Sequence, residues 1–377
     1  MEVNNKDGIA KIIAYYLPQF YPCEFNDKWY GKGFTEWTNV GKAKPLFKGH
    51  YQPKVPSDLG YYDLRVSEVA EKQAELAREA GVFGFAYWHY WWAGKMLLNM
   101  PAERMLDAMN PDFPFMFAWA NENWFKKLWD KDAKKDTLIM EQTYPGFKDN
   151  IDHFNYCLPF FKDKRYLTYN GKPMFLIYHP LNFPDVKAFM QQWDTLIKDA
   201  GIAEGFYWMA CAINNDNEYN QLVALGFDAV NFLVVEQRIG QKTYGDKKSL
   251  GSWLYSLKWY FNQLRRKPAV FDYNKIIDSI WIEKYDRNEN VIPTIIPNWD
   301  HTPRSGSKGN VFINTSPQKF EKLCMNVLSK VRYKNNKLVM LKSWNEWAEG
   351  NYMEPDLKYG KGFIQALNKV VSTTKDG

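Results

Sequence analysis

Leu338-Val339-Met340-Leu341-Lys342-Ser343-Trp344-Asn345-Glu346-Trp347-Ala348-Glu349-Gly350 is the stretch that decides the fold. It opens with an apolar run, Leu338–Lys342, typical of a parallel strand that is buried on both faces. Two carboxylates, Glu346 and Glu349, follow at once and are flanked by tryptophans. The stretch therefore predicts a core strand that delivers a pair of acidic side chains to the edge of a sheet.

Seven similar apolar runs precede this one, and helical patterns lie between most of them. The clearest helix is predicted over Arg65–Ala80, with Gly81 as its C-terminal stop. Alternating strands and helices predict a (β/α)8 TIM barrel with enlarged βα loops, as a single domain over residues 1–377. The alternative is an open doubly wound sheet, which is less favoured because no GxGxxG or phosphate loop follows the first strand. The predicted strands are Ile12–Leu17, Val82–Trp88, Phe115–Ala120, Met174–Tyr178, Phe206–Ala212, Ala229–Leu233, Val291–Ile296 and Leu338–Lys342.

Two connections in this scheme are long, at about residues 18–64 and 236–290. The second contains an amphipathic aromatic helix, predicted over Trp253–Leu264, followed by the basic run Arg265-Arg266-Lys267. Loops of this length in a compact domain are often functional. The basic run is either a solvated helix end or a contact with a membrane surface, a lipid-linked glycan or an acidic glycan.

Composition and charge exclude several classes of protein. The net charge of +6 comes from 49 basic and 43 acidic residues spread along the chain, which argues against nucleic acid as a partner. No stretch approaches the roughly 18 apolar residues of a membrane span. The first residues lack the apolar core of a signal peptide, so a cytoplasmic location is expected. The four cysteines lie far apart, so we expect neither a zinc site nor a disulfide framework, and no cofactor.

Aromatic and polar residues collect where the predicted strands end, which is where TIM barrels place their active sites. Aromatic residues are 17% of the chain, a high share that sugar-binding clefts help to explain. We therefore expect an oligosaccharide or polysaccharide substrate. The side chains predicted to bind it are Tyr16, Glu36, Trp37, Trp88, His89, Trp119, Asn121, Glu122, Trp124, His179, Trp299, Asp300, Trp344, Asn345 and Trp347. A metal site is the rival interpretation of His89, His179, Asp300 and His301, but their spacing matches no ligand pattern, so no metal is predicted.

Glu346 and Glu349 are the predicted catalytic residues. If the chain turns helically after the strand, residues three apart share one face, with Cβ atoms roughly 5–6 Å apart. Two carboxyl groups that close cannot both ionise easily, so one serves as an acid and the other as a base. Pairs of this kind cut glycosidic bonds. The alternative is a helix N-terminus whose acidic residues complement the helix dipole.

Five segments in order resemble a known family. They are Ala14-Tyr15-Tyr16-Leu17-Pro18-Gln19-Phe20, Gly33-Phe34-Thr35-Glu36-Trp37-Thr38-Asn39-Val40, Gly84-Phe85-Ala86-Tyr87-Trp88, Trp119-Ala120-Asn121-Glu122-Asn123-Trp124 and Ser343–Gly350. Together they are similar to the WbsX-type, glycoside hydrolase family 99-like proteins of bacterial polysaccharide gene clusters.

This resemblance implies a (β/α)8 barrel and retaining endo-α-mannosidase chemistry through a 1,2-anhydro sugar. It implies that Glu346 is the base acting on the sugar 2-hydroxyl. It implies that Glu349 protonates the leaving oxygen and later activates water. Because the WbsX branch is often named a glycosyltransferase, a glycosyltransferase or transglycosylase of O-antigen or capsule synthesis is the second hypothesis. A non-catalytic glycan-binding barrel is the third.

Overall fold

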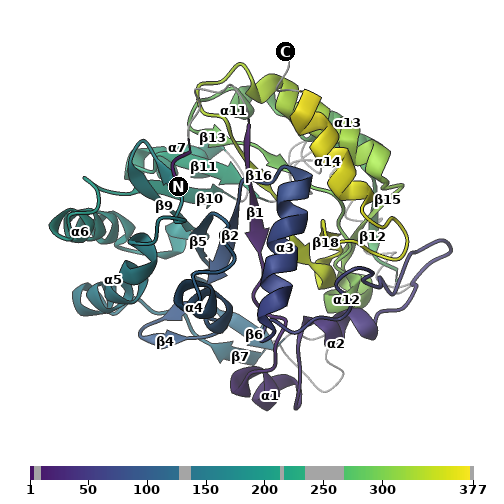
Figure 1. Ribbon diagram of the computed structural model, residues 1–377, viewed down its shortest axis with the longest axis horizontal. Helices are drawn as coiled ribbons and strands as arrows, with labels where there is room; N and C mark the ends of the chain where they lie inside the picture. The colour runs from purple at the N-terminus through teal and green to yellow at the C-terminus, as the bar shows by residue number, and fades with distance from the viewer. Residues whose placement is uncertain (4–9, 127–136, 213–215, 234–266, 374–377) are drawn as a thin grey trace.

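A computed structural model describes residues 1–3, 10–126, 137–212, 216–233 and 267–373. At its centre, parallel strands form a barrel surrounded by helices, which confirms the predicted (β/α)8 architecture (Figure 1). All eight predicted strands are present, with ends that differ by up to two residues from those expected. They are β1 (Lys11–Tyr16), β2 (Gly84–His89), β5 (Phe115–Trp119), β9 (Lys172–Ile177), β10 (Tyr207–Ala212), β11 (Ala229–Phe232), the pair β13 (Val291–Ile292) and β14 (Thr294–Ile295), and β16 (Leu338–Leu341).

The barrel closes through its seventh strand. β13 pairs with β11 and β14 pairs with β16, while β1 pairs with both β2 and β16. The sequence predicted one strand, Val291–Ile296, but Pro293 divides it because proline has no N–H to donate to the ladder. The carbonyl of Pro293 still accepts a hydrogen bond from the N–H of Met340 at 2.9 Å, so the ring stays continuous across the break.

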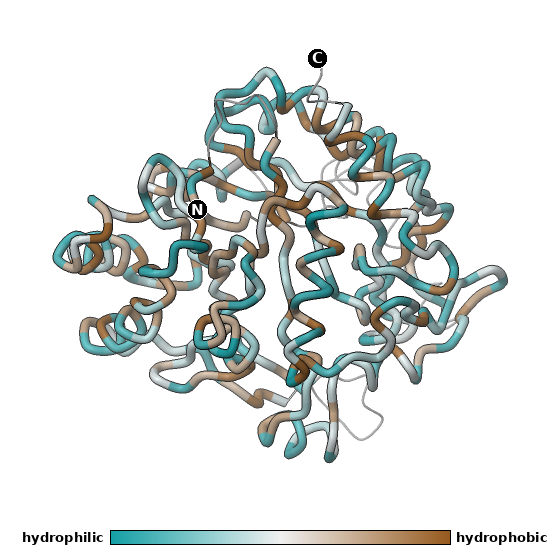
Figure 2. Tube along the Cα trace, in the orientation of Figure 1, coloured by the Kyte–Doolittle hydropathy of each residue, from teal (hydrophilic) through white to brown (hydrophobic). Residues whose placement is uncertain are grey.

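Apolar composition explains why these runs become the core. Almost every residue of the barrel strands is buried, as expected for strands covered by helices outside and by packed side chains inside. Along the outer helices, apolar and polar residues alternate in Figure 2, because only one stripe of each helix faces the strands. These helices are α3 (Ser67–Ala80), α4 (Met100–Asp107), α5 (Phe147–Phe161), α6 (Val186–Asp199), α7 (Asp216–Leu225), α10 (Tyr273–Ser279), α11 (Glu283–Asp286), α13 (Pro317–Val331) and α14 (Gly362–Thr373).

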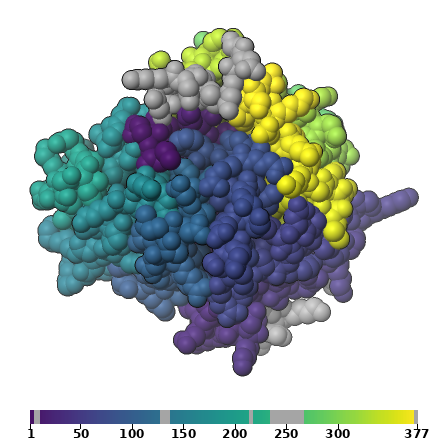
Figure 3. All heavy atoms as spheres, in the orientation of Figure 1, coloured from purple at the N-terminus to yellow at the C-terminus, as the bar shows by residue number. Residues whose placement is uncertain are grey.

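The predicted helix over Arg65–Ala80 corresponds to α3, which begins two residues later. Gly81 ends it in the left-handed conformation, and its N–H bonds back to the last turn. A side chain at this position would also meet Val371 of α14, because a Cβ there would lie 3.2 Å from Val371 Cγ1. This close approach lets the first and last of these helices pack side by side, as Figure 3 shows in blue and yellow.

The loops at the carboxyl ends of the strands are enlarged, and they gather at the end toward which β1 points in Figure 1. The long loop at 18–64 folds into α1 (Glu24–Tyr30) and α2 (Glu36–Gly41). Two hairpins, β3 (Trp91–Trp92) with β4 (Lys95–Met96) and β6 (Trp124–Lys126) with β7 (Thr137–Met140), follow β2 and β5. The remaining short elements are β8 (Thr168–Tyr169), η1 (Pro180–Asn182), β12 (Ala269–Asp272), α12 (Thr302–Ser305), η2 (Gly306–Lys308), β15 (Asn310–Ile313), β17 (Asn345–Glu346), η3 (Trp347–Glu349) and β18 (Asn351–Tyr352).

Part of the second long loop, residues 267–290, carries β12, α10 and α11. The predicted helix Trp253–Leu264 and Arg265-Arg266 of the basic run lie outside the described residues. Within the described part of the chain, no helix is both long enough and apolar enough to span a bilayer.

Candidate active site

Glu346 and Glu349 lie in a tight hairpin that follows β16. β17 and β18 pair antiparallel, with Glu346 opposite Asn351, and the 3-10 turn η3 between them carries Glu349. Gly350, at φ 60°, ends the turn in the left-handed region. The helical turn that the sequence predicted is thus present, and it brings the two carboxyl groups into a hydrogen bond with each other.

Asn345 ties this hairpin to the end of β1. Its Oδ1 accepts from the N–H of Leu17 at 2.8 Å and its Nδ2 donates to the carbonyl of Leu17 at 3.0 Å. One residue earlier, the N–H of Trp344 donates to the carbonyl of Tyr15 at 2.8 Å. The acidic turn is therefore fixed to the barrel by the residue that precedes it.

Asp300 supports the turn from the other side. Its backbone N–H donates to the carbonyl of Glu349 at 2.6 Å. Its carboxylate accepts from Gln52 Nε2 at 2.7 Å, bonds His50 Nε2 at 2.8 Å and accepts from the Thr302 hydroxyl at 2.6 Å. Burial alone would raise the pKa of Asp300, but these hydrogen bonds and nearby Lys54 lower it. Asp300 is therefore a buried anion that joins the first long loop to the turn that carries Glu349.

Glu354 anchors the tryptophan that lies between the two glutamates. Its carboxyl accepts hydrogen bonds from Trp347 Nε1 at 2.6 Å, Gln73 Nε2 at 2.6 Å and the Tyr62 hydroxyl at 3.0 Å. Burial raises its pKa to about 7, although these donors oppose the rise. Glu354 is thus a buried carboxyl that changes charge near neutral pH.

This raised pKa predicts a pH-dependent stability. Between pH 4.5 and about 7 the folded state holds a proton that the unfolded state has released, so stability falls as pH rises through this range. Between pH 5 and 8 we expect wild type to lose about 3 kcal/mol relative to Glu354→Gln, which has no charge to bury. Urea unfolding of both proteins at several pH values measures this difference. Parallel curves for the two proteins would show that Glu354 does not titrate in this range.

A cavity of about 520 Å³ lies in front of the hairpin, within the usual size of small-molecule sites. Arg304, on α12, reaches into it between two carboxylates. Its Nη1 donates to Glu349 Oε1, and its Nε and Nη2 each lie 3.2 Å from Glu36 Oε2. His301 Nε2 lies 3.6 Å from the same oxygen of Glu349. Of the two glutamates Glu346 and Glu349, the second therefore has both positively charged partners beside it.

The two glutamates differ in charge because of this one-sided arrangement. Burial raises the pKa of Glu346, and the neighbouring negative charge of Glu349 raises it further. Burial would also raise the pKa of Glu349, but Arg304, the hydrogen bond from Glu346 and His301 lower it to about 2. Arg304 and His301 thus favour the ionised form of Glu349, and burial beside that charge favours the protonated form of Glu346.

Comparison with known proteins assigns the family. The model of the family described as "Glycosyltransferase WbsX" matches residues 12–367. The chain belongs to the WbsX family. Two relatives, the uncharacterized proteins WxcX of Xanthomonas campestris pv. campestris strains B100 and ATCC 33913, are each 30% identical over 382 residues. The alignments cover 97% of this WbsX chain, which spans about half the length of each relative.

Solved structures share the fold of this WbsX protein. Two structures of the GH99 endo-alpha-mannosidase from Bacteroides thetaiotaomicron match with TM-scores of 0.55 and 0.54 at 14% identity, over 97% of both chains. A "glycoside hydrolase-like protein" matches with a TM-score of 0.55 at 16% identity, over 96% of this chain and 94% of that one. At these identities the likeness establishes a common barrel.

The cavity of the WbsX chain gathers seven of the seventeen predicted site residues. They are Glu36, Trp88, Glu122, Trp124, Trp299, Glu346 and Glu349. The other ten are not among its lining residues, and substrate binding by these ten stays a prediction. They are Tyr16, Trp37, His89, Trp119, Asn121, His179, Asp300, Trp344, Asn345 and Trp347.

Strand geometry explains part of this division. Successive side chains of a strand point to opposite faces, so only every second residue at a strand end meets the cavity. Trp88 and Tyr178 line it, whereas the next residues, His89 and His179, do not. The same alternation places Leu17 on the cavity wall and turns Tyr16 away to donate its hydroxyl to Gln73 at 2.8 Å.

Other predicted residues brace the wall from behind. Trp119 donates from Nε1 to the carbonyl of Trp91 at 3.2 Å, and Asn121 bonds the backbone of His179. Trp37 donates to the carbonyl of Tyr62 at 2.7 Å and packs on Trp347. The partners in these contacts also lie outside the cavity lining, so the contacts form a layer behind it.

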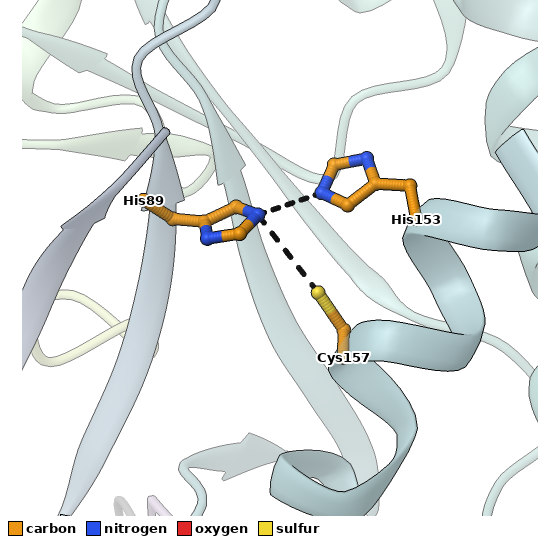
Figure 4. A group of neighbouring side chains, drawn as sticks. All are labelled: His89, His153 and Cys157. Carbon is orange, nitrogen blue, oxygen red and sulfur yellow. Dashed lines mark hydrogen bonds between the residues drawn. The ribbon is translucent and has the colours of Figure 1, made fainter. Parts of the chain in front are cut away.

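Among the described residues, one group of three possible metal ligands comes together, formed by His89, His153 and Cys157 (Figure 4). His89 lies on β2 and the other two on α5, outside the cavity lining. The two Nε2 atoms are already hydrogen-bonded at 2.7 Å, and burial lowers the pKa of both histidines, so both are neutral. Burial also raises the pKa of the Cys157 thiol, which lies 4.0 Å from His89 Nε2. We interpret the group as a self-satisfied core contact.

Several cavity residues were missed or not assigned from the sequence alone. Arg304 gave no signal, because a single arginine in the polar segment Thr302–Ser305 fits any exposed loop. Lys342 was predicted only as the end of a strand, yet it lines the cavity with its Nζ 4.1 Å from the centre of the Trp299 ring. Tyr90 and Tyr178 could have been found from their places at strand ends.

Proposed function

We propose that this chain is a retaining glycoside hydrolase of the endo-α-mannosidase type, with Glu346 and Glu349 as its catalytic pair. The observation that carries the proposal is a pair of neighbouring carboxyl groups, that of Glu346 buried and that of Glu349 largely buried, at the carboxyl end of a TIM barrel and in front of a cavity. Inverting enzymes need their carboxyls roughly 6.5–9.5 Å apart to admit a water between them. Carboxyl groups close enough to shift each other's pKa suit the shorter spacing of retaining enzymes, about 5–5.5 Å.

The walls of the cavity suit a sugar. Trp88, Trp124 and Trp299 present indole rings, and Glu122 and Glu36 add carboxylates that can accept hydrogen bonds from hydroxyl groups. In the proposed reaction one glutamate removes the proton of the 2-hydroxyl, which closes on the anomeric carbon to give a 1,2-anhydro sugar. The other glutamate protonates the leaving oxygen. The cytoplasmic location and contact with a lipid-linked glycan stay predictions.

A second candidate function is glycosyl transfer, because the WbsX family is named for glycosyltransferases. A transferase or transglycosylase would use the same pair but exclude water in favour of an acceptor hydroxyl. A non-catalytic glycan-binding barrel is the third candidate, and its cavity would bind a glycan without changing it.

One screen separates these functions. Purified protein is incubated with α-mannosides and O-antigen oligosaccharides, with and without nucleotide sugars, and the products are identified by mass spectrometry. We expect new reducing ends in the absence of any donor, with the α-anomer formed first. Extended products that require a donor would establish transfer instead, and binding without products would establish the third candidate.

A further inference from the structure

Four buried polar atoms on the lining of the cavity have no hydrogen-bond partner among the described residues. They are Oδ1 and Nδ2 of Asn26, Oδ1 of Asn39 and Nε1 of Trp299. Asn26 is 0% exposed, Asn39 2% and Trp299 6%. Burying a polar group without a hydrogen bond destabilises a fold, so native proteins keep few such groups and each one needs an explanation. Asn26 is the extreme case, because both halves of its amide are unpaired.

The segment that carries Asn26 is otherwise well fixed. Asn26 lies on α1, and Oδ1 of the next residue, Asp27, accepts a hydrogen bond from the N–H of Gly33 at 2.8 Å. Tyr30 follows Asn26 by one helical turn, on the same face of α1. The rings of Tyr30 and Phe34 stack with their centres 4.6 Å apart, and both residues line the cavity. This part of the first long loop therefore presents a buried amide next to an aromatic surface.

The two asparagines belong to one wall of the cavity, which starts at the proposed catalytic pair. α2 carries Asn39 and packs against η3, the turn that holds Glu349. Asn39 donates a hydrogen bond to Glu36, which leaves its Oδ1 unpaired. α1 continues the wall, since it is the preceding helix of the same loop. A cavity of about 520 Å³ falls in the range that holds drug-sized ligands, which are larger than one hexose. A second sugar unit therefore has room beside the first.

The chemistry of the Asn26 amide indicates what it would bind. Its Oδ1 accepts and its Nδ2 donates, so the partner must offer a donor and an acceptor side by side. Neighbouring hydroxyl groups of a sugar ring do so, because each hydroxyl can act in either way. An acetamido group fits less well. Its planar trans amide points the N–H and the C=O in opposite directions, so one asparagine cannot reach both.

We propose that α1 and α2 form a second sugar subsite, in which Asn26 binds two vicinal hydroxyl groups of the unit next to the one that is cleaved. This inference rests on the proposed function and adds one requirement to it, an unsubstituted diol on the neighbouring unit. Asn39 Oδ1 and Trp299 Nε1 lie on the lining of the same cavity. The first can accept a hydrogen bond from a further hydroxyl group of the glycan, and the second can donate one.

Stability measurements distinguish this subsite from a structural asparagine. Asn26→Leu replaces the amide by an apolar side chain of similar size, so its urea midpoint should equal or exceed that of wild type. Asn231→Leu is the matched control and should unfold at clearly lower urea. Asn231 is equally buried, but it bonds the Tyr15 hydroxyl at 2.9 Å, the Ile292 carbonyl at 2.8 Å and Thr294 Oγ1 at 2.9 Å. A loss in Asn26→Leu as large as that in Asn231→Leu would overturn the inference.

A glycan array tests the class of ligand without any turnover. The array carries α-mannobiosides and O-antigen fragments, each beside analogues with one hydroxyl methylated or replaced by an acetamido group. We expect wild type to lose about tenfold or more in affinity when either of two neighbouring hydroxyls on one ring is blocked. Asn26→Leu and Asn26→Ala should show no such preference. The same preference in all three proteins, no binding by wild type, or tighter binding of the acetamido analogues would overturn the inference.

The array and the screen together separate this inference from the proposed function. A protein that binds arrayed glycans through Asn26 but releases no reducing ends keeps the subsite and loses the hydrolase assignment. A protein that cleaves a glycan with equal kcat/KM in wild type and Asn26→Leu keeps the hydrolase assignment and loses the subsite.

Discussion

Glutamine at position 349 should lower kcat by about a thousandfold or more while leaving glycan affinity within a few-fold of wild type. Glu349 must exchange a proton with the reacting sugar whichever of the two roles it takes, and an amide cannot do so. The side chain keeps its length and shape, so the cavity wall is little changed. Steady-state kinetics on the substrate from the screen, with calorimetry for binding, measures both quantities.

Glu122→Gln is the control for this variant. It makes the same chemical change on the wall of the same cavity, but Glu122 is not part of the hydrogen-bonded pair. We expect its effect to fall mainly on KM, with kcat within about tenfold of wild type. A Glu349→Gln protein that keeps the wild-type kcat would remove Glu349 from the mechanism.

The Gly350→Ala variant should be less stable than wild type, with the β17–β18 hairpin displaced from Lys54 and Asp300 behind it. Gly350 has φ 60°, and a Cβ there would overlap Lys54 Nζ and lie 2.7 Å from Asp300 Cβ and 2.9 Å from Asp300 N. The backbone strain costs about 1–2 kcal/mol and the overpacking roughly 1–3 kcal/mol more. Because Glu349 is the preceding residue, a displacement of about 1 Å can also reduce turnover by about a hundredfold.

Gly360→Ala separates the cost of backbone strain from the cost of overpacking. Gly360 has φ 50°, but nothing lies within 4 Å of the position its Cβ would take. We expect it to lose only the strain energy, about 1–2 kcal/mol, and to keep wild-type activity. Urea unfolding and kinetics on the three proteins give the comparison. Equal losses in both variants would show that the contacts behind Gly350 do not matter.

The fold could be predicted because each barrel strand carries its own local signal. Runs such as Ile12–Leu17 and Leu338–Lys342 are apolar and short, and turn residues and helical patterns separate them. The break at Pro293 was visible in the sequence, but the way the two halves still close the ring depends on their separate partners, β11 and β16. Pairing between strands that are far apart in the sequence cannot be predicted from the pattern of neighbouring residues.

The prediction of the site was most specific where a single segment holds its residues. Glu346 and Glu349 share a single turn, so their spacing alone was informative. The contacts of Arg304 with Glu36 and Glu349 join residues that are 268 and 45 positions apart, and no local pattern links them. The sequence did not show that His89 lies outside the cavity for a different reason. Successive side chains of a strand alternate between its two faces, so Trp88 lines the cavity while His89 points toward α5. The prediction used only the residue type and the position near a strand end.

The pairing of β1 with β16 also determines when the barrel can close during synthesis on the ribosome. Lys11 lies opposite Leu338, so β1 waits for more than 300 residues of synthesis before its second neighbour emerges. Until then the nascent chain exposes two unpaired apolar edges, at β1 and β14, which are prone to pair with other chains. Since Glu346 and Glu349 follow β16 directly, the last strand to enter the barrel also brings the proposed catalytic pair, and a nascent chain acquires both together.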